Sequence, residues 1–155
     1  MFKKIVLPLV ITGLVVMLLM WISGTRIGGI FDAPTLIPVI LLPFILATAG
    51  FGFKRSQMAF SAPFYADANA ADQKAAIAYF NTVLSYMTGF SVLLLMTGFI
   101  GILHAFPYPE DSTIIGTNIS VALLSVFYGA LGSLLFVLPF RTAAASRLAE
   151  IEAQP

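Results

Sequence analysis

Four long runs of apolar residues divide the chain, and none of them contains Asp, Glu, Lys or Arg. They cover residues 5–22, 36–53, 83–106 and 114–140. A helix needs about 20 consecutive apolar residues to cross the hydrocarbon core of a bilayer. The runs do not alternate with polar residues, and backbone in lipid must satisfy its own hydrogen bonds, so helices are favoured over strands. The pattern predicts an all-α membrane protein with four transmembrane helices in a single domain, residues 1–155.

The polar segments between the runs predict how the helices are connected. Residues 54–82 form the longest connection, and their second half, from Asp72 to Tyr86, has helical composition. We expect that helix to continue into the third span and to project from the membrane. Pro43 lies inside the second span and predicts a kink there. Asp32, in a Gly- and Pro-containing loop, is expected to form a turn or a helix cap.

Basic residues indicate the orientation of the spans. Seven of the eight fall on one side of the predicted membrane, and only Arg26 falls on the other. The positive-inside rule therefore places both termini and the middle loop, with the projecting part of the third helix, in the cytoplasm. A cytoplasmic tail is expected at residues 141–155. The seven residues are Lys3, Lys4, Lys54, Arg55, Lys74, Arg141 and Arg147.

Composition excludes several classes of protein. Of the 155 residues 59% are hydrophobic and 10% are charged, which is far from the usage of a soluble globular domain. The absence of cysteine excludes disulfides and thiol chemistry, and a net charge of +1 indicates no nucleic-acid partner. The sequence has no cluster of metal ligands and no phosphate-binding loop, and its lone histidine, His104, lies near the outer surface. We therefore expect no enzyme activity, no metal and no cofactor.

Small and hydroxyl-bearing residues mark the last two spans. Small residues three to four positions apart lie on one face of a helix and allow close helix packing. Such faces either pack within one subunit or line an interior that holds another helix or water, and the spacing leaves both open. Hydroxyls in membrane helices usually bond to the carbonyl four residues earlier, whereas hydroxyls facing a cavity could serve an ion. The third span contains Ser91, Thr97, Gly98, Gly101 and Ala105, and the fourth contains Ala122, Ser125, Gly129 and Gly132 or Ser133.

About half of the chain resembles the MotA/TolQ/ExbB proton-channel family. The segment 95–139 reads LMTGFIGILHAFPYPEDSTIIGTNISVALLSVFYGALGSLLFVLP, similar to the third and fourth membrane helices of that family. The segment 31–37, FDAPTLI, resembles the start of the second helix in MotA-type proteins. The matching positions are Gly101, Gly116, the run 121–124, the run 127–130 and Pro139.

The resemblance implies a homopentamer in the bacterial inner membrane, in which the third and fourth helices surround a dimer of MotB/ExbD/TolR-like single-span partners. Those partners would carry the proton-binding aspartate that this chain lacks within its spans. Thr97 and Ser125 would then border the ion pathway, and Tyr128 and Pro139 would shape the fourth helix. Small residues facing the pore would give clearance for the partner: Gly98, Gly101, Ala122 and Gly129.

The chain also departs from the family pattern. Thr97-Gly98 stands where the family has Gly-Thr, and Ser125-Val126 stands where many members have two threonines. The proline expected near Ser91 is absent, and so is the large cytoplasmic insertion that engages the flagellar rotor. The hypothesis is a subunit of a proton-driven, or else sodium-driven, rotary motor that is not a conventional flagellar stator. The alternatives are a non-conducting tetraspan scaffold and a self-sufficient oligomeric ion channel.

Overall fold

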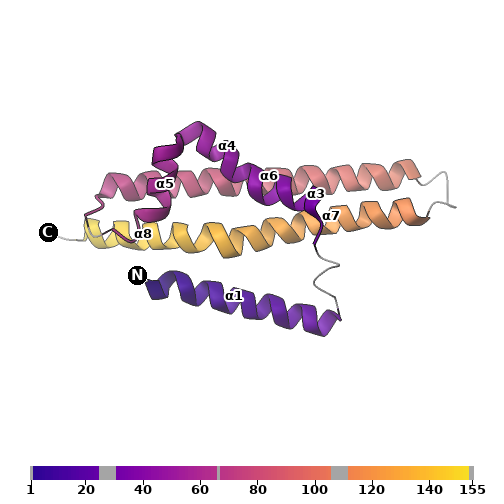
Figure 1. Ribbon diagram of the computed structural model, residues 1–155, viewed down its shortest axis with the longest axis horizontal. Coiled ribbons are helices and arrows are strands. Elements are labelled where there is room, and N and C mark those ends of the chain that lie inside the picture. Colours follow the sequence, from indigo (N-terminus) through magenta and orange to yellow (C-terminus); the bar gives the residue numbers. More distant parts are fainter. Residues whose placement is uncertain (1, 25–30, 66, 106–111, 154–155) are drawn as a thin grey trace.

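The computed structural model describes residues 2–24, 31–65, 67–105 and 112–153, and every regular element in these ranges is helical. Four helical stretches are long and apolar enough to cross a membrane: Ile5–Ile22, Ala33–Phe51, Ala70–His104 and Ile115–Glu152. The predicted all-α fold with four membrane helices is confirmed at this level. The helices are α1 (Phe2–Ser23), α3 (Ala33–Leu36), α4 (Leu42–Phe51), α5 (Phe53–Ser61), α6 (Ala70–Ala105), α7 (Ser112–Gly132) and α8 (Leu138–Glu152) (Figure 1).

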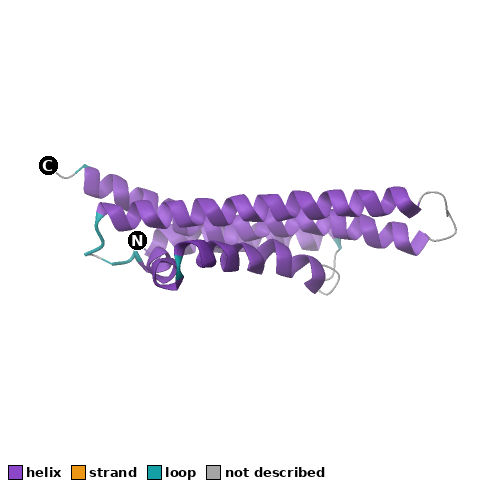
Figure 2. Cartoon of the chain, turned by 90° about the horizontal axis from the view of Figure 1, so that it is seen from above, coloured by secondary structure: helices purple, strands orange, loops and turns teal. Residues whose placement is uncertain are grey.

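Two long antiparallel rods form the centre of the molecule. One is α6, and the other is α7 followed by α8; they lie side by side along their lengths (Figures 1 and 2). The α3–α4 stretch packs across both rods, whereas α1 packs against α8 and the segment Ser133–Val137. Only 6% of the α1 span is buried, so its apolar side chains face outward, as a membrane would require.

Two prolines interrupt the regular hydrogen bonding of the spans. Proline lacks a backbone N–H and its ring clashes with the carbonyl four residues earlier. Each interruption is a π-helical turn, Ile37–Leu41 before Pro43 and Ser133–Val137 before Pro139. A π-helical turn thus directly precedes α4, in which Pro43 is the second residue, and the kink predicted at this proline stays a prediction. At Pro139 the helix does not end, because the wider turn accommodates the ring and α8 continues to Glu152.

The helix expected from Asp72 into the third span is confirmed as α6. It has 36 residues, which corresponds to about 54 Å of helix, well beyond the ~30 Å hydrocarbon core. Asn69 and Asp72 fix its start through a reciprocal pair of hydrogen bonds. The Asn69 N–H donates to Asp72 Oδ2 at 3.1 Å, and the Asp72 N–H donates to Asn69 Oδ1 at 3.0 Å.

A short helix that the sequence analysis did not predict, α5, lies at the same end of the bundle as the start of α6 (Figure 1). Gly52, with φ of +83°, separates it from α4, since only glycine adopts this conformation without strain. The Gln73 side chain holds the segment against α6, its Nε2 donating to the Ala62 carbonyl at 2.8 Å. Residues 54–71 are therefore not a simple loop.

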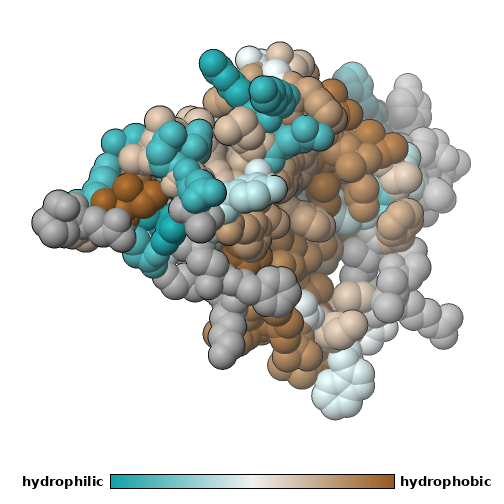
Figure 3. Space-filling view, turned by 60° about the vertical axis from the view of Figure 1, so that its left-hand side comes forward, coloured by the Kyte–Doolittle hydropathy of each residue, from teal (hydrophilic) through white to brown (hydrophobic). Residues whose placement is uncertain are grey.

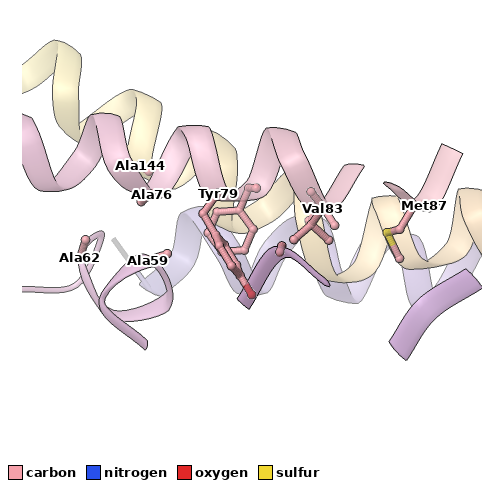
Figure 4. Packing of buried hydrophobic residues seen from close by; sticks show 10 residues of the cluster. Ala59, Ala62, Ala76, Tyr79, Val83, Met87 and Ala144 are labelled. Atoms are coloured by element: carbon pink, nitrogen blue, oxygen red, sulfur yellow. The ribbon is translucent and has the colours of Figure 1, made fainter. Parts of the chain in front are cut away.

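The best-packed core lies where α4, α5, α6 and α8 meet. Tyr79, Phe80, Val83 and Met87 of α6 are buried to 2% exposure or less. Figure 4 shows Tyr79, Val83 and Met87 within this cluster. The Phe60 ring of α5 lies 5.2 Å from Phe80, in an edge-to-face arrangement that favours aromatic pairs. The helices at this end of the bundle are therefore held together by a buried apolar cluster.

Candidate functional site: the interface of α6 and α7

Glycines allow α6 and α7 to approach closely toward the α6 C-terminus. A Cβ atom built on Gly98 would lie 2.7 Å from both the Ala122 Cβ and the Asn118 carbonyl oxygen. A Cβ on Gly101 would lie 2.6 Å from Asn118 Oδ1. Real Cβ atoms do not approach other atoms this closely, so Gly98, which meets backbone, requires glycine, whereas a side chain at position 101 would displace the Asn118 side chain.

The same arrangement continues toward the middle of the pair. A Cβ on Gly129 would collide with Ser91 Oγ, and one on Gly132 would collide with the Met87 methyl group. Of the two interpretations that the sequence left open for the small residues, packing within the chain is therefore what the structure shows. The pore-facing role of Gly98, Gly101, Ala122 and Gly129 stays a prediction.

Ser125 is completely buried and links the two helices. Its Oγ lies 2.8 Å from the Ala122 carbonyl oxygen on its own helix and 3.1 Å from the Ser91 carbonyl oxygen on α6. A hydroxyl has one proton, so these two acceptors share it. Ser125 is placed as an interhelical hydrogen-bond donor at the centre of the pair.

Thr97 of α6, unlike Ser125, is not buried between the two helices. Its side chain is exposed, and its Oγ1 donates to the Leu93 carbonyl at 2.9 Å, which is the self-bonding expected of hydroxyls in membrane helices. The two proposed ion-pathway residues therefore differ in their surroundings, since Ser125 is buried and bonded to both helices and Thr97 is exposed and bonded to its own helix. Their shared role in an ion pathway stays a prediction.

A groove of about 290 Å³ runs over the exposed side of the α6–α7 pair, beside Ser125. Thr88 and Ser133 on its walls donate to carbonyls of their own helices, at 2.9 Å to Leu84 and 2.7 Å to Gly129. The third hydroxyl, Ser91 Oγ, is buried and has no hydrogen-bond partner among the described residues. The groove is lined by Thr88, Ser91, Val92, Val126, Gly129, Ala130 and Ser133.

Sequence reasoning did not single out Thr88, which lines this groove. Thr88 and Thr97 are nine residues apart, which is two and a half turns, so they lie on opposite sides of α6. The signal that could have found Thr88 is its position three residues before Ser91, on the same helix face.

Tyr128 and Asp32 connect α7 to the start of the second span. Tyr128 is 2% exposed, and its Oη accepts a hydrogen bond from the Asp32 N–H at 2.8 Å. Asp32 Oδ2 in turn accepts from the Thr35 N–H at 3.2 Å and caps α3, as predicted for this carboxylate. Tyr128 is thus placed to fix a neighbouring segment. The helix-shaping role assigned to Tyr128 and Pro139 by the family resemblance is not tested by these contacts.

Titratable groups are sparse along the spans. Among the described residues no group of three or more His, Cys, Asp or Glu side chains could hold a metal ion. His104 lies exposed in the last turn of α6. The described ion pairs, Lys74 with Glu152 at 2.9 Å and Arg147 with Glu150 at 3.3 Å, lie at the opposite end of the bundle.

These features define a multi-pass, four-helix membrane protein. Comparisons of the chain with protein-family models, with curated proteins and with solved structures found no match.

Proposed function

We propose that the chain is a subunit of an ion-driven motor or energy-transducing complex of the MotA/TolQ/ExbB type. Five copies would surround two single-span partner helices in a bacterial inner membrane, with both termini in the cytoplasm. The family resemblance suggests the proposal. The observation that supports it most directly is the groove on the α6–α7 pair, which has hydroxyl groups along it and no carboxylate of its own.

The groove suits contact with a partner helix. Its lining includes the small, exposed Ala130, which leaves room for a second helix, and the hydroxyl-bearing residues Thr88, Ser91 and Ser133. Uncharged hydroxyls can orient water or a hydrated cation without the cost of burying a charge in the membrane. A carboxylate supplied by the partner would complete an ion-binding site that the chain alone lacks.

The driving force for such a device is the membrane potential. One elementary charge crossing the membrane releases about 2.3 kcal/mol per 100 mV. For this energy to produce rotation, the ring and the partner helices must pack closely, without side chains that block their movement past one another. Val126 stands at the groove where ExbB-type members have a threonine, so the hydroxyls here come from Thr88, Ser91 and Ser133 instead.

The packing of the glycines argues against the alternative that the chain is a non-conducting scaffold. A scaffold that assembles through its small-residue faces needs those faces to be free. Gly98, Gly101, Gly129 and Gly132 are instead covered by side chains or backbone of the same chain. Surfaces that remain open to other proteins include the groove and nearby apolar residues such as Val92, Leu123 and Val126, which are 48–65% exposed.

The number of copies in the complex tests the proposal. The chain would be isolated from native membranes in mild detergent, and the complex would be weighed by native mass spectrometry and imaged by cryo-electron microscopy. We expect five chains of 16.6 kDa and two copies of a short single-span protein with an aspartate near the start of its helix. A stable monomer, or a ring whose inner wall is built from α1 and α4, would refute the proposal. A ring without partners but with a continuous hydrated pore would favour the self-sufficient channel.

A further inference from the structure

Two basic residues, Lys54 and Arg55, stand apart from the other cations at the polar end of the molecule. Both are exposed in the first turn of α5, within four residues of the end of α4 at Phe51. Neither has an ion-pair or hydrogen-bond partner for its side chain among the described residues. Basic side chains in a first turn oppose the helix macrodipole, so they do not stabilise α5.

Three other cations at this end whose side chains the structure describes have partners of their own. Lys74 pairs with Glu152 at 2.9 Å, and Arg147 pairs with Glu150 at 3.3 Å. Arg141 Nε donates to Asn81 Oδ1 at 2.6 Å. Among the side chains that the structure describes at this end, Lys54 and Arg55 are therefore the cations without a partner.

Exposed aromatic rings lie at the start of α5 and shortly after its end. Phe53, directly before Lys54, is 72% exposed, and Tyr65, just after α5, is 65% exposed. The opposite side of α5 is firmly packed, since Ser56 and Ala59 are buried and the Phe60 ring contacts Phe80. With this end turned toward the viewer, Figure 3 shows hydrophilic side chains gathered at the upper left and hydrophobic ones over much of the remaining face.

We propose that α5 is an interfacial helix whose Lys54 and Arg55 bind the phosphate of an anionic phospholipid. Aromatic rings favour the level of the lipid headgroups, and basic residues beside a membrane span attract anionic lipids. Gly52 turns the chain out of the second span at this level, and the Gln73 contact holds the end of α5 to α6. The site is continuous with the lipid-facing spans, which favours a lipid over a soluble anion. It would exist whether or not the chain belongs to a motor.

The test uses the full-length protein in detergent micelles, titrated separately with phosphatidylglycerol and phosphatidylcholine and monitored by native mass spectrometry. Each basic residue near an anionic lipid surface contributes about fivefold in affinity, so K54Q/R55Q is expected to bind phosphatidylglycerol about 25-fold more weakly. Binding of phosphatidylcholine should not change. The preference of the unmodified protein for phosphatidylglycerol should also shrink at 0.5 M salt, because exposed charges are screened.

Two controls separate this site from general charge effects. K74Q/R147Q removes the same number of charges from paired positions at the same end and should bind phosphatidylglycerol within about twofold of the unmodified protein. K54R/R55K keeps both charges and should keep the binding. The proposal is overturned if K54Q/R55Q binds phosphatidylglycerol normally, or if K74Q/R147Q loses as much. It is also overturned if phosphatidylcholine and inorganic phosphate compete equally well for the site.

Discussion

The Tyr128 hydroxyl accepts a hydrogen bond from the backbone N–H of Asp32, 96 residues away in the sequence. The bond joins the buried face of α7 to the cap of α3, where the second span begins. It satisfies a partly buried backbone donor that precedes the first turn of the helix. The position of the second span relative to the α6–α7 pair therefore depends on a side chain in the fourth span.

Replacing Tyr128 with phenylalanine removes this acceptor and leaves the ring packing in place. We expect the free energy of unfolding to fall by about 1 kcal/mol, the usual net contribution of such a hydrogen bond. Thermal unfolding in detergent, monitored by circular dichroism, measures the change. Tyr86→Phe is the matched control, because Tyr86 is 40% exposed and its loss of a hydroxyl should have almost no effect. Equal stability of the two variants would contradict the role given to Tyr128.

Gly98→Ala tests the close approach of α6 and α7. The added methyl group would meet Ala122 and the Asn118 carbonyl at 2.7 Å, so the helices must separate. We expect destabilisation of about 1–3 kcal/mol, as for overpacking elsewhere. Gly89→Ala is the control on the same helix, since nothing lies within 4 Å of its added Cβ. There, alanine should stabilise by up to about 1 kcal/mol through helix propensity. The prediction fails if both variants shift the melting temperature in the same direction.

The spans themselves could be predicted from the sequence because the requirement of lipid is simple: about 20 apolar residues and no charge. The continuous α6 could also be predicted, since Asp72 and the helix-forming residues after it leave no signal for a break. In contrast, α5 was missed. Its stability comes from tertiary contacts, Gln73 with Ala62 and the Phe60 ring with its neighbours, and a nine-residue segment gives little signal of its own.

The candidate site could be predicted only in part. The spacing of the small residues in the third and fourth spans correctly marked the two helices that pack most closely, and Ser125 lies between them. The sequence did not distinguish the several faces of α6, all of which are rich in apolar residues. Thr88, which lines the groove together with Ser91 and Ser133, was therefore not singled out, and the ion-pathway role of Thr97 stays a prediction. Which side of a uniformly apolar helix is covered depends on its neighbours and cannot be read from periodicity.

Gln73→Ala tests whether α5 depends on its contact with α6. The substitution removes the donor for the Ala62 carbonyl and empties a completely buried position, so we expect a local loss of about 1–3 kcal/mol. Hydrogen–deuterium exchange should show faster exchange over residues 53–65, with the amides in the middle of α7 unchanged. Gln57→Ala, at an exposed position of α5, is the control. Unaltered exchange in the Gln73 variant would show that aromatic packing alone holds the helix.

Ser91 and Ser125 lie side by side but have opposite hydrogen-bonding states, which allows stability and function to be separated. Ser125 donates across the interface, so Ser125→Val should lower the free energy of unfolding by about 1 kcal/mol or more and reduce ion-dependent function while leaving assembly intact. Ser91 Oγ has no partner among the described residues, and removing an unsatisfied buried hydroxyl also removes its desolvation penalty of about 1–3 kcal/mol. Ser91→Ala should therefore keep or slightly raise the melting temperature.

If the groove serves an ion in the assembled complex, the Ser91→Ala substitution should also lower proton flux into vesicles containing the complex isolated from native membranes. Full flux in a stable Ser91→Ala complex would exclude this oxygen from the pathway, and a marked loss of stability would show that it has a structural partner after all.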